Sequence, residues 1–275
     1  MNTRLAVWSS YYCSLTPENA VLELKKYGIT ASELSDEHGA VLLNRGEPKV
    51  IGEQFKAFLE KEEFIMTQGH LWLQAKLCDS EDVVYRLLDW VDLYDTIGVK
   101  NAVLHVSGLV DMPDLTFEDR VCRFVEKLKI VEDHIKKNRL DICICIENAG
   151  EWFRSIDTLN YLLDRLDDDC FGICLDTGHL NLSSDNNDQR NFILKAGKRL
   201  KALHIADNEG KADQHLMPFG KGRINFEEVV SALREIDYEG LFNLEIPGER
   251  NAPLPILGYK LEYIQKCYDY LMDLK

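Results

Sequence analysis

The sequence lacks the features that mark exported, membrane-spanning and multidomain proteins. Residues 1–8 contain no long apolar run, so neither a signal peptide nor a membrane span is expected. The eight cysteines include no Cys-x-x-Cys pair, and several lie in apolar runs such as residues 142–146. This pattern favours buried, reduced thiols in a cytoplasmic protein over disulfides or a thiolate-bound structural zinc. Seven prolines and no low-complexity segment leave nothing that marks a linker between domains.

Basic residues are also scarce relative to acidic ones. The chain has 32 lysines and arginines against 47 aspartates and glutamates, which gives a formal net charge of −15. Such a charge repels phosphate backbones and anionic membrane surfaces, so neither nucleic acid nor membrane is expected as a partner. Apolar residues make up 45% of the chain, enough for an ordinary globular core and too many for a disordered protein.

Short apolar runs alternate with longer segments of helical period along the whole chain, a pattern typical of a parallel sheet wrapped by helices. The expected strands are 4–9, 31–34, 64–69, 102–106, 142–147, 172–175, 202–205 and 242–246. The expected helices are 17–27, 50–61, 80–97, 117–137, 155–165, 189–198, 226–236 and 260–274. Eight such units in 275 residues predict a (β/α)₈ TIM barrel, an α/β fold, as a single domain over residues 1–275. The second strand is the weakest of the eight because its sequence, Ala-Ser-Glu-Leu, is short and polar.

Ionisable side chains gather where the expected strands end, which is where barrels of this type carry their active sites. Five of the seven histidines fall there or in the loops that follow, and His38 and His134 do not. The residues at these positions are His70, His105, Glu147, Asp176, His179, His204, Asp213, His215 and Glu245. A carboxylate buried after an apolar run is costly without a cation or hydrogen-bond donors beside it. The pattern therefore predicts a metal centre, and oxygen and imidazole donors suit Mn²⁺, Mg²⁺, Co²⁺ or Zn²⁺.

The motifs around these residues resemble the xylose-isomerase-like barrels, which include sugar phosphate isomerases/epimerases, ketose 3-epimerases and endonuclease IV nucleases. The similar segments are IENAG (146–150), CLDTGH (174–179), HIADN (204–208), DQH (213–215), GKGRI (220–224) and LE (244–245). They occur in the order that the family has on successive strands.

The resemblance to the epimerase branch implies that one divalent ion is held by Glu147, Asp176, His204 and Glu245. It also gives Glu147 and Glu245 an acid/base role and makes His179 a substrate contact. The endonuclease IV branch implies a cluster of three zinc ions whose further ligands match His70, His105, His179, Asp213 and His215. Because many sugar-isomerase relatives carry some of these extra residues, the match separates the two branches poorly.

The first hypothesis for function is a divalent-metal-dependent sugar or sugar phosphate isomerase/epimerase, with Mn²⁺ as the leading metal. A carboxylate would move a proton next to a carbonyl through an enediolate. His70, His105 and Trp152 are further candidates for contacts with the sugar, and Arg223 could lie near a phosphate. The sequence leaves a homo-oligomer open.

Three alternatives remain. An endonuclease IV-like nuclease for abasic DNA needs basic strand-end loops, and these loops are mixed in charge. Their basic residues are Lys76, Arg154, Lys211, Lys221, Arg223 and Arg250, and their acidic ones include Asp111, Asp114, Glu151, Asp185 and Asp188. A dehydratase acting on a keto-inositol could use the same barrel and metal. A non-catalytic binding barrel would have no need for so many ionisable residues at one mouth.

Overall fold

A computed structural model of the protein describes residues 1, 3–109, 112, 114–150, 152–182, 188–249 and 251–274. Eight parallel strands follow the sheet order β7-β6-β5-β4-β3-β2-β1-β8. They are β1 (Arg4–Trp8), β2 (Ala31–Leu34), β3 (Ile65–His70), β4 (Asn101–Leu104), β5 (Cys143–Glu147), β6 (Phe171–Asp176), β7 (Leu200–His204) and β8 (Leu241–Leu244). The amide of Ile205 donates to the carbonyl of Asn243 at 2.8 Å and its carbonyl accepts from Glu245 at 3.1 Å, which joins the two ends of the sheet. The fold is the predicted (β/α)₈ barrel.

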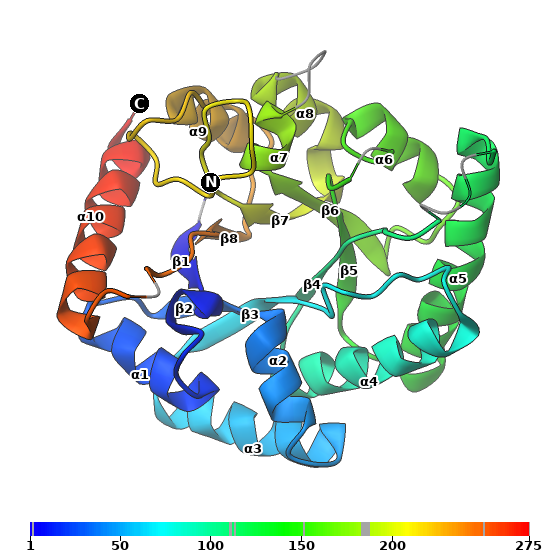
Figure 1. Ribbon diagram of the computed structural model, residues 1–275, viewed down its shortest axis with the longest axis horizontal. Coiled ribbons are helices and arrows are strands. Elements are labelled where there is room, and N and C mark those ends of the chain that lie inside the picture. Colours follow the sequence, from blue (N-terminus) through cyan, green and yellow to red (C-terminus); the bar gives the residue numbers. More distant parts are fainter. Residues whose placement is uncertain are drawn as a thin grey trace.

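Helices surround the barrel on all sides (Figure 1). They are α1 (Pro17–Lys26), α2 (Asp36–Leu43), α3 (Pro48–Lys61), α4 (Glu81–Ile97), α5 (Phe117–Asn138), α6 (Ile156–Leu163), α7 (Thr177–Asn181), α8 (Gln189–Ala196), α9 (Phe226–Glu235) and α10 (Leu254–Asp273). Two short 3₁₀ helices, η1 (Ser9–Tyr12) and η2 (Gly197–Arg199), complete the elements. Local chemistry sets several boundaries: Thr116 and Asp119 form a reciprocal capping box at the start of α5, and Gly98 ends α4 with φ of +106°. No helix in the described ranges is long and apolar enough to cross a membrane.

All eight predicted strands are present, with boundaries that differ by no more than two residues. The helix predictions missed α2 and α7, and they began α10 six residues too late, at 260 instead of Leu254. Pro255 lies in the first turn of α10, where a proline needs no hydrogen-bonded N–H, so the proline-containing segment is helical instead of a loop. In α2, Gly39 weakens the helical pattern of the sequence. A residue with a side chain does not fit there, because a Cβ would lie 2.3 Å from the Tyr94 hydroxyl.

The interior of the barrel is built in layers, because residues two apart on a strand face the same way. Glu147, Asp176 and His204, the last residues of β5, β6 and β7, therefore lie one layer above a small residue of the same strand. These residues, Cys145, Cys174 and Ala202, pack with Val103 in a buried apolar cluster. All eight cysteines are free; four of them are buried, whereas Cys13 and Cys122 are exposed, contrary to the prediction of buried thiols.

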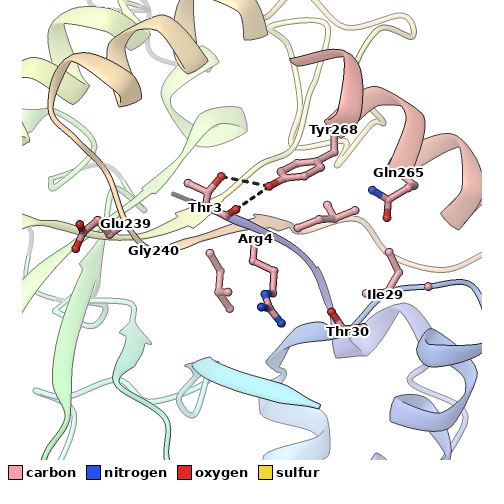
Figure 2. Close-up of a pocket in the computed structure, with 11 residues that line it drawn as sticks. Thr3, Arg4, Ile29, Thr30, Glu239, Gly240, Gln265 and Tyr268 are labelled. Carbon is pink, nitrogen blue, oxygen red and sulfur yellow. Dashed lines mark hydrogen bonds between the residues drawn. The ribbon is translucent and has the colours of Figure 1, made fainter. Parts of the chain in front are cut away.

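The amino-terminal end of the barrel has a cavity of about 480 Å³ that is distant in the fold from the strand ends that carry the ionisable residues. Figure 2 shows its lining, with Arg4 at the start of β1, Thr30 just before β2 and Gly240 just before β8. The hydroxyl of Tyr268 on α10 donates to the Thr3 carbonyl at 2.9 Å, tying the C-terminal helix to the first strand. In TIM barrels this end serves stability, so the functional site is sought at the other end.

Candidate functional site

The ionisable residues predicted from the sequence lie at the carboxyl ends of six strands. His70, Glu147, Asp176 and His204 are the last residues of β3, β5, β6 and β7. His105 and Glu245 directly follow β4 and β8. Their donor atoms form overlapping groups in which all atoms lie within 4.8 Å of one another. These groups are His70–His105–Glu147, Glu147–Cys174–His204, Glu147–Asp176–His179 and Asp176–His204–Glu245.

The four residues expected to bind one cation are almost entirely buried, with exposures between 0 and 7%. The Nδ1 atom of His204 lies 3.1 Å from Glu147 Oε2 and 3.2 Å from Glu245 Oε2, but without hydrogen-bond geometry. Among the described residues, each of the four carries one buried atom that makes no contact with hydrogen-bond geometry. These atoms are Glu147 Oε1, Asp176 Oδ2, His204 Nδ1 and Glu245 Oε2. An unpaired buried polar atom costs about 1–3 kcal/mol, so a divalent cation beside such atoms would offset that cost. Asp176, His204 and Glu245 form one group of donors, and Glu147 shares one group with His204 and another with Asp176.

Hydrogen bonds on the far side of three imidazoles fix which nitrogen is free to bind a cation. A carboxylate or a carbonyl can only accept, so the ring nitrogen that contacts one must carry the proton. His204 donates from Nε2 to Glu33 Oε2 at 2.9 Å, so its Nδ1, which faces the carboxylates, is the nitrogen that can exchange a proton for a cation. His70 and His215 donate from Nδ1 to the carbonyls of Leu71 and Glu245, at 2.7 and 2.8 Å, which leaves Nε2 free. Metal-binding histidines in proteins are oriented in this way.

Further contacts extend the cluster on both sides of Glu147. His105 Nε2 lies 2.9 Å from Glu147 Oε2, and His179 Nδ1 lies 2.7 Å from Glu147 Oε1. On the outer side, His179 and His215 approach the same carboxylate oxygen of Asp213, at 3.3 and 3.2 Å. The nine predicted donors therefore form one continuous chain of contacts. Within the described part of the chain, the donor atoms of His179, Asp213 and His215 do not all lie within 4.8 Å of one another, unlike those of the four groups named above.

The electrostatics of the cluster are set by burial opposed by opposite charges. Burial disfavours the charged form of Glu147, but the imidazoles of His105 and His204 hold its pKa well below the ordinary value. Burial is likewise outweighed at Glu245, where His204 lowers the pKa to about 2. At Asp176 burial dominates and raises the pKa to about 7, despite the attraction of His179. In the metal-free protein, the raised pKa of His204 and the lowered pKa values of Glu147 and Glu245 therefore reflect attraction between these opposite charges, which outweighs burial.

Burial alone would lower the pKa of His70, but its contacts with Glu147 raise that pKa to about 9. The same balance at His215, with burial outweighed by Asp213 and Glu245, raises its pKa to about 10. A cation that binds these nitrogens must displace their protons, so binding is coupled to pH.

Three residues that carry the site were not predicted from the sequence. Glu33 on β2 is fully buried and accepts hydrogen bonds from Gln68 Nε2, from Asn243 Nδ2 at 2.7 Å and from His204. Gln68 and Asn243 lie two residues before His70 and Glu245, in the layer beneath the donors. The sequence did contain a sign of Glu33, because a glutamate in the middle of an expected strand is unusual. Its polarity was one reason why that strand was the weakest of the eight predictions.

The remaining predicted substrate contacts lie in loops after β5 and β7. Trp152 is 39% exposed, and its ring packs against the guanidinium of Arg120, 4.5 Å from the ring centroid. Arg223 is exposed, and its backbone amide donates to Asp207 Oδ1 at 3.0 Å. The roles of Trp152 and Arg223 toward a substrate stay predictions.

The glycine-rich turn that includes Arg223 is anchored by a carboxylate. Asp207 Oδ1 also accepts from the amide of Ile224 at 3.2 Å. A Cβ at Gly222 would lie 1.8 Å from Asp207 Cγ, so the glycine permits the loop to lie against this carboxyl. These amides are thus already occupied, and Gly222 serves backbone geometry instead of forming a cradle for phosphate.

Comparison with known proteins gives three findings. A family model described as a xylose isomerase-like TIM barrel matches residues 21–267. Uncharacterized protein y4fM of Sinorhizobium fredii is 32% identical over 171 residues, which cover 58% of this chain and 51% of that protein, so the match spans about half the length of this relative. Probable endonuclease 4 of Mycoplasmopsis agalactiae is 22% identical over 254 residues, 82% of this chain and 89% of that protein.

Among solved structures, D-psicose 3-epimerase with D-tagatose from Clostridium cellulolyticum H10 superposes with a TM-score of 0.79 at 16% identity. The match covers 99% of this chain and all of that one. At this identity the likeness establishes the shared fold.

Proposed function

The chain belongs to the xylose isomerase-like TIM barrel family, and from this premise we propose that it is a divalent-metal-dependent sugar isomerase or epimerase. One observation carries the proposal. Glu147, Asp176, His204 and Glu245 lie in overlapping donor groups at the barrel mouth, and each carries a buried atom without a hydrogen bond to the described residues. Three of these residues carry carboxyl groups, and two of them, Glu147 and Glu245, could also exchange a proton with a substrate.

Glu147, Asp176, His204 and Glu245 would hold the cation, and their oxygen and imidazole donors suit Mn²⁺. Such an ion supplies a Lewis acid that polarises a carbonyl and stabilises the negative charge of an enediolate. The chain itself supplies the orientation: His204 is fixed by Glu33, and Asp176 is held through its backbone amide, which donates to the side chain of Asn148 at 2.6 Å.

Glu147 and Glu245 are the proposed proton-transfer groups. Both have a pKa below the ordinary value despite burial, so both are carboxylates and can act as bases. They come from β5 and β8, which lie on different sides of the barrel in the sheet order, so they can approach a sugar from different faces. Epimerisation requires this arrangement, because one face loses a proton and the other gains one. His179, 2.7 Å from Glu147, is proposed to contact the substrate.

An abasic-site nuclease is the second candidate, favoured by a specific observation. The group His70–His105–Glu147 offers donors for another cation beside the first, and the similarity to Probable endonuclease 4 extends over most of the chain. The charge of the protein opposes this candidate, since DNA affinity comes largely from cationic contacts with phosphates. In the described loops, Lys76 lies 3.8 Å from Asp79, which reduces its net positive field. Four loop residues weighed above, Asp111, Glu151, Asp185 and Arg250, lie outside the described residues.

The test places both activities side by side. Protein purified without chelators is analysed for metal content and supplied in turn with Mn²⁺, Co²⁺, Mg²⁺ or Zn²⁺. A panel of ketoses, aldoses, their phosphates and keto-inositols is then assayed in deuterium oxide, where an enediolate route incorporates deuterium next to the carbonyl. We expect conversion and exchange for at least one sugar. Nicking of an abasic duplex with no sugar converted would make the nuclease the better assignment, and dehydration of a keto-inositol would make the protein a lyase.

A further inference from the structure

Glu33 is a buried carboxylate in the interior of the barrel, one layer below the donor cluster. Its side chain is fully buried, and three nitrogen donors converge on it from β3, β7 and β8. The Nε2 atom of His204 lies 2.9 and 3.1 Å from its two oxygens. Each of these contacts comes from a nitrogen that can donate, so Glu33 acts as their common acceptor.

A buried carboxylate of this kind needs a compensating charge. Within the ranges that the structure describes, the ion-pair contact of Glu33 is with His204, and no lysine or arginine pairs with it. Gln68 and Asn243 are neutral amides that lower the cost of burial but add no charge. Glu33 is thus linked to the donor cluster through His204, whose other nitrogen faces Glu147 and Glu245.

We propose that Glu33 is a positioning residue that acts on a bound cation through His204. By accepting from Nε2–H, it fixes the ring so that Nδ1 points toward Glu147 and Glu245. By adding a negative charge behind the ring, it strengthens the imidazole as a ligand. This inference rests on the metal centre of the proposed function and assigns a role to a residue outside the ligand set.

The position of Glu33 is itself fixed by rigid elements. Gln68 donates to Glu33 and also to the Leu203 carbonyl at 3.2 Å, next to His204 in the chain. Asn243 holds the carboxylate from β8, on the other side of β1 in the sheet. Partners on several strands leave Glu33 a single orientation, as a group that fixes another side chain requires.

The test is Glu33→Gln, which keeps the size and removes the charge. Glu132→Gln is the matched control, because Glu132 on α5 is also buried, at 5% exposure, but pairs with Lys129 and Lys136. Binding of Mn²⁺ and Zn²⁺ to folded, metal-free protein is measured by calorimetry, with thermal unfolding in parallel. We expect Glu33→Gln to weaken metal binding roughly 10–100-fold without lowering the metal-free melting temperature. Glu132→Gln should lower that temperature and leave the affinity unchanged.

A merely structural role would give the opposite result for Glu33→Gln: a lower metal-free melting temperature and an affinity within twofold of wild type. That result would overturn the inference. If the variant does not fold, long-range ¹H–¹⁵N NMR of the wild-type protein with Zn²⁺ decides the question. We expect His204 protonated at Nε2 and metal-bound at Nδ1, and the reverse assignment would refute the role.

The measurements use no sugar, so they separate this inference from the proposed function. Glu33-dependent metal binding in a protein that converts no sugar would support the positioning role and count against the isomerase. Sugar turnover with metal affinity independent of Glu33 would do the reverse.

Discussion

Replacing Asp176 by asparagine should remove the cation while leaving the fold intact. One carboxylate oxygen of Asp176, Oδ1, accepts from the amide of His179 and caps α7, whereas the other, Oδ2, has no hydrogen-bond partner in the part of the chain that the structure describes. Asparagine caps helices as well as aspartate does, so the cap should keep its oxygen. The amide NH₂ must then take the place of Oδ2 and direct N–H groups, instead of a lone pair, at the cation.

The size of the effect follows from binding linkage. At a free-metal concentration of 100 times Kd, the wild-type protein gains about 2.7 kcal/mol of stability. For 275 residues this corresponds to a melting temperature roughly 5 °C higher. An affinity lowered about 100-fold leaves roughly 0.4 kcal/mol at the same concentration, a shift of less than about 1 °C. Without metal the variant should be at least as stable as wild type, because burial already raises the Asp176 pKa to about 7.

Differential scanning fluorimetry with and without Mn²⁺, supported by elemental analysis of the purified proteins, measures both quantities. The matched control is Asp188→Asn, since Asp188 caps α8 through an equivalent bond to Asn191, at 2.9 Å, and lies outside the donor groups. The control should keep the wild-type metal shift. A full metal shift and unchanged metal content in Asp176→Asn would show that the unpartnered oxygen does not bind a cation.

Three further predictions concern catalysis, pH and the loop after β7. Glu147→Gln and Glu245→Gln should each lower turnover by about 10²–10⁴-fold and abolish deuterium exchange next to the carbonyl; wild-type rates in both would refute their acid/base roles. The pKa of His70 is about 9 in the metal-free protein against 6.5 for an ordinary histidine, so its contribution to stability is complete below pH 6.5 and is lost as pH rises through 9. Metal-free melting temperatures should therefore fall over this range while metal affinity rises, and affinity independent of pH would contradict the proton displacement. Gly222→Ala should lower the free energy of unfolding by about 1–3 kcal/mol in chemical denaturation, because its methyl group overlaps Asp207, and an unchanged value would refute that contact.

The sequence by itself determined the barrel and the residue types at its mouth. Eight apolar runs with helical segments between them are local patterns, and each run forms a strand because burial on both faces demands apolar residues there. The position of an ionisable residue at the end of a run is also local. Since the carboxyl ends of parallel barrel strands meet at one mouth, the proximity of Glu147, Asp176, His204 and Glu245 could be expected without coordinates.

Only the tertiary structure decided which groups lie behind and beneath these donors. Glu33 and His204 are 171 positions apart, and their contact depends on the closure of the barrel, which brings β2 and β7 to face each other across its interior. Likewise, the need for Gly39 and Gly222 arises from side chains of distant segments, Tyr94 and Asp207, that occupy the space of a Cβ. A local pattern specifies the direction of a side chain relative to its own strand or helix. It does not specify what that side chain meets, because the partner is supplied by the packing of the whole chain.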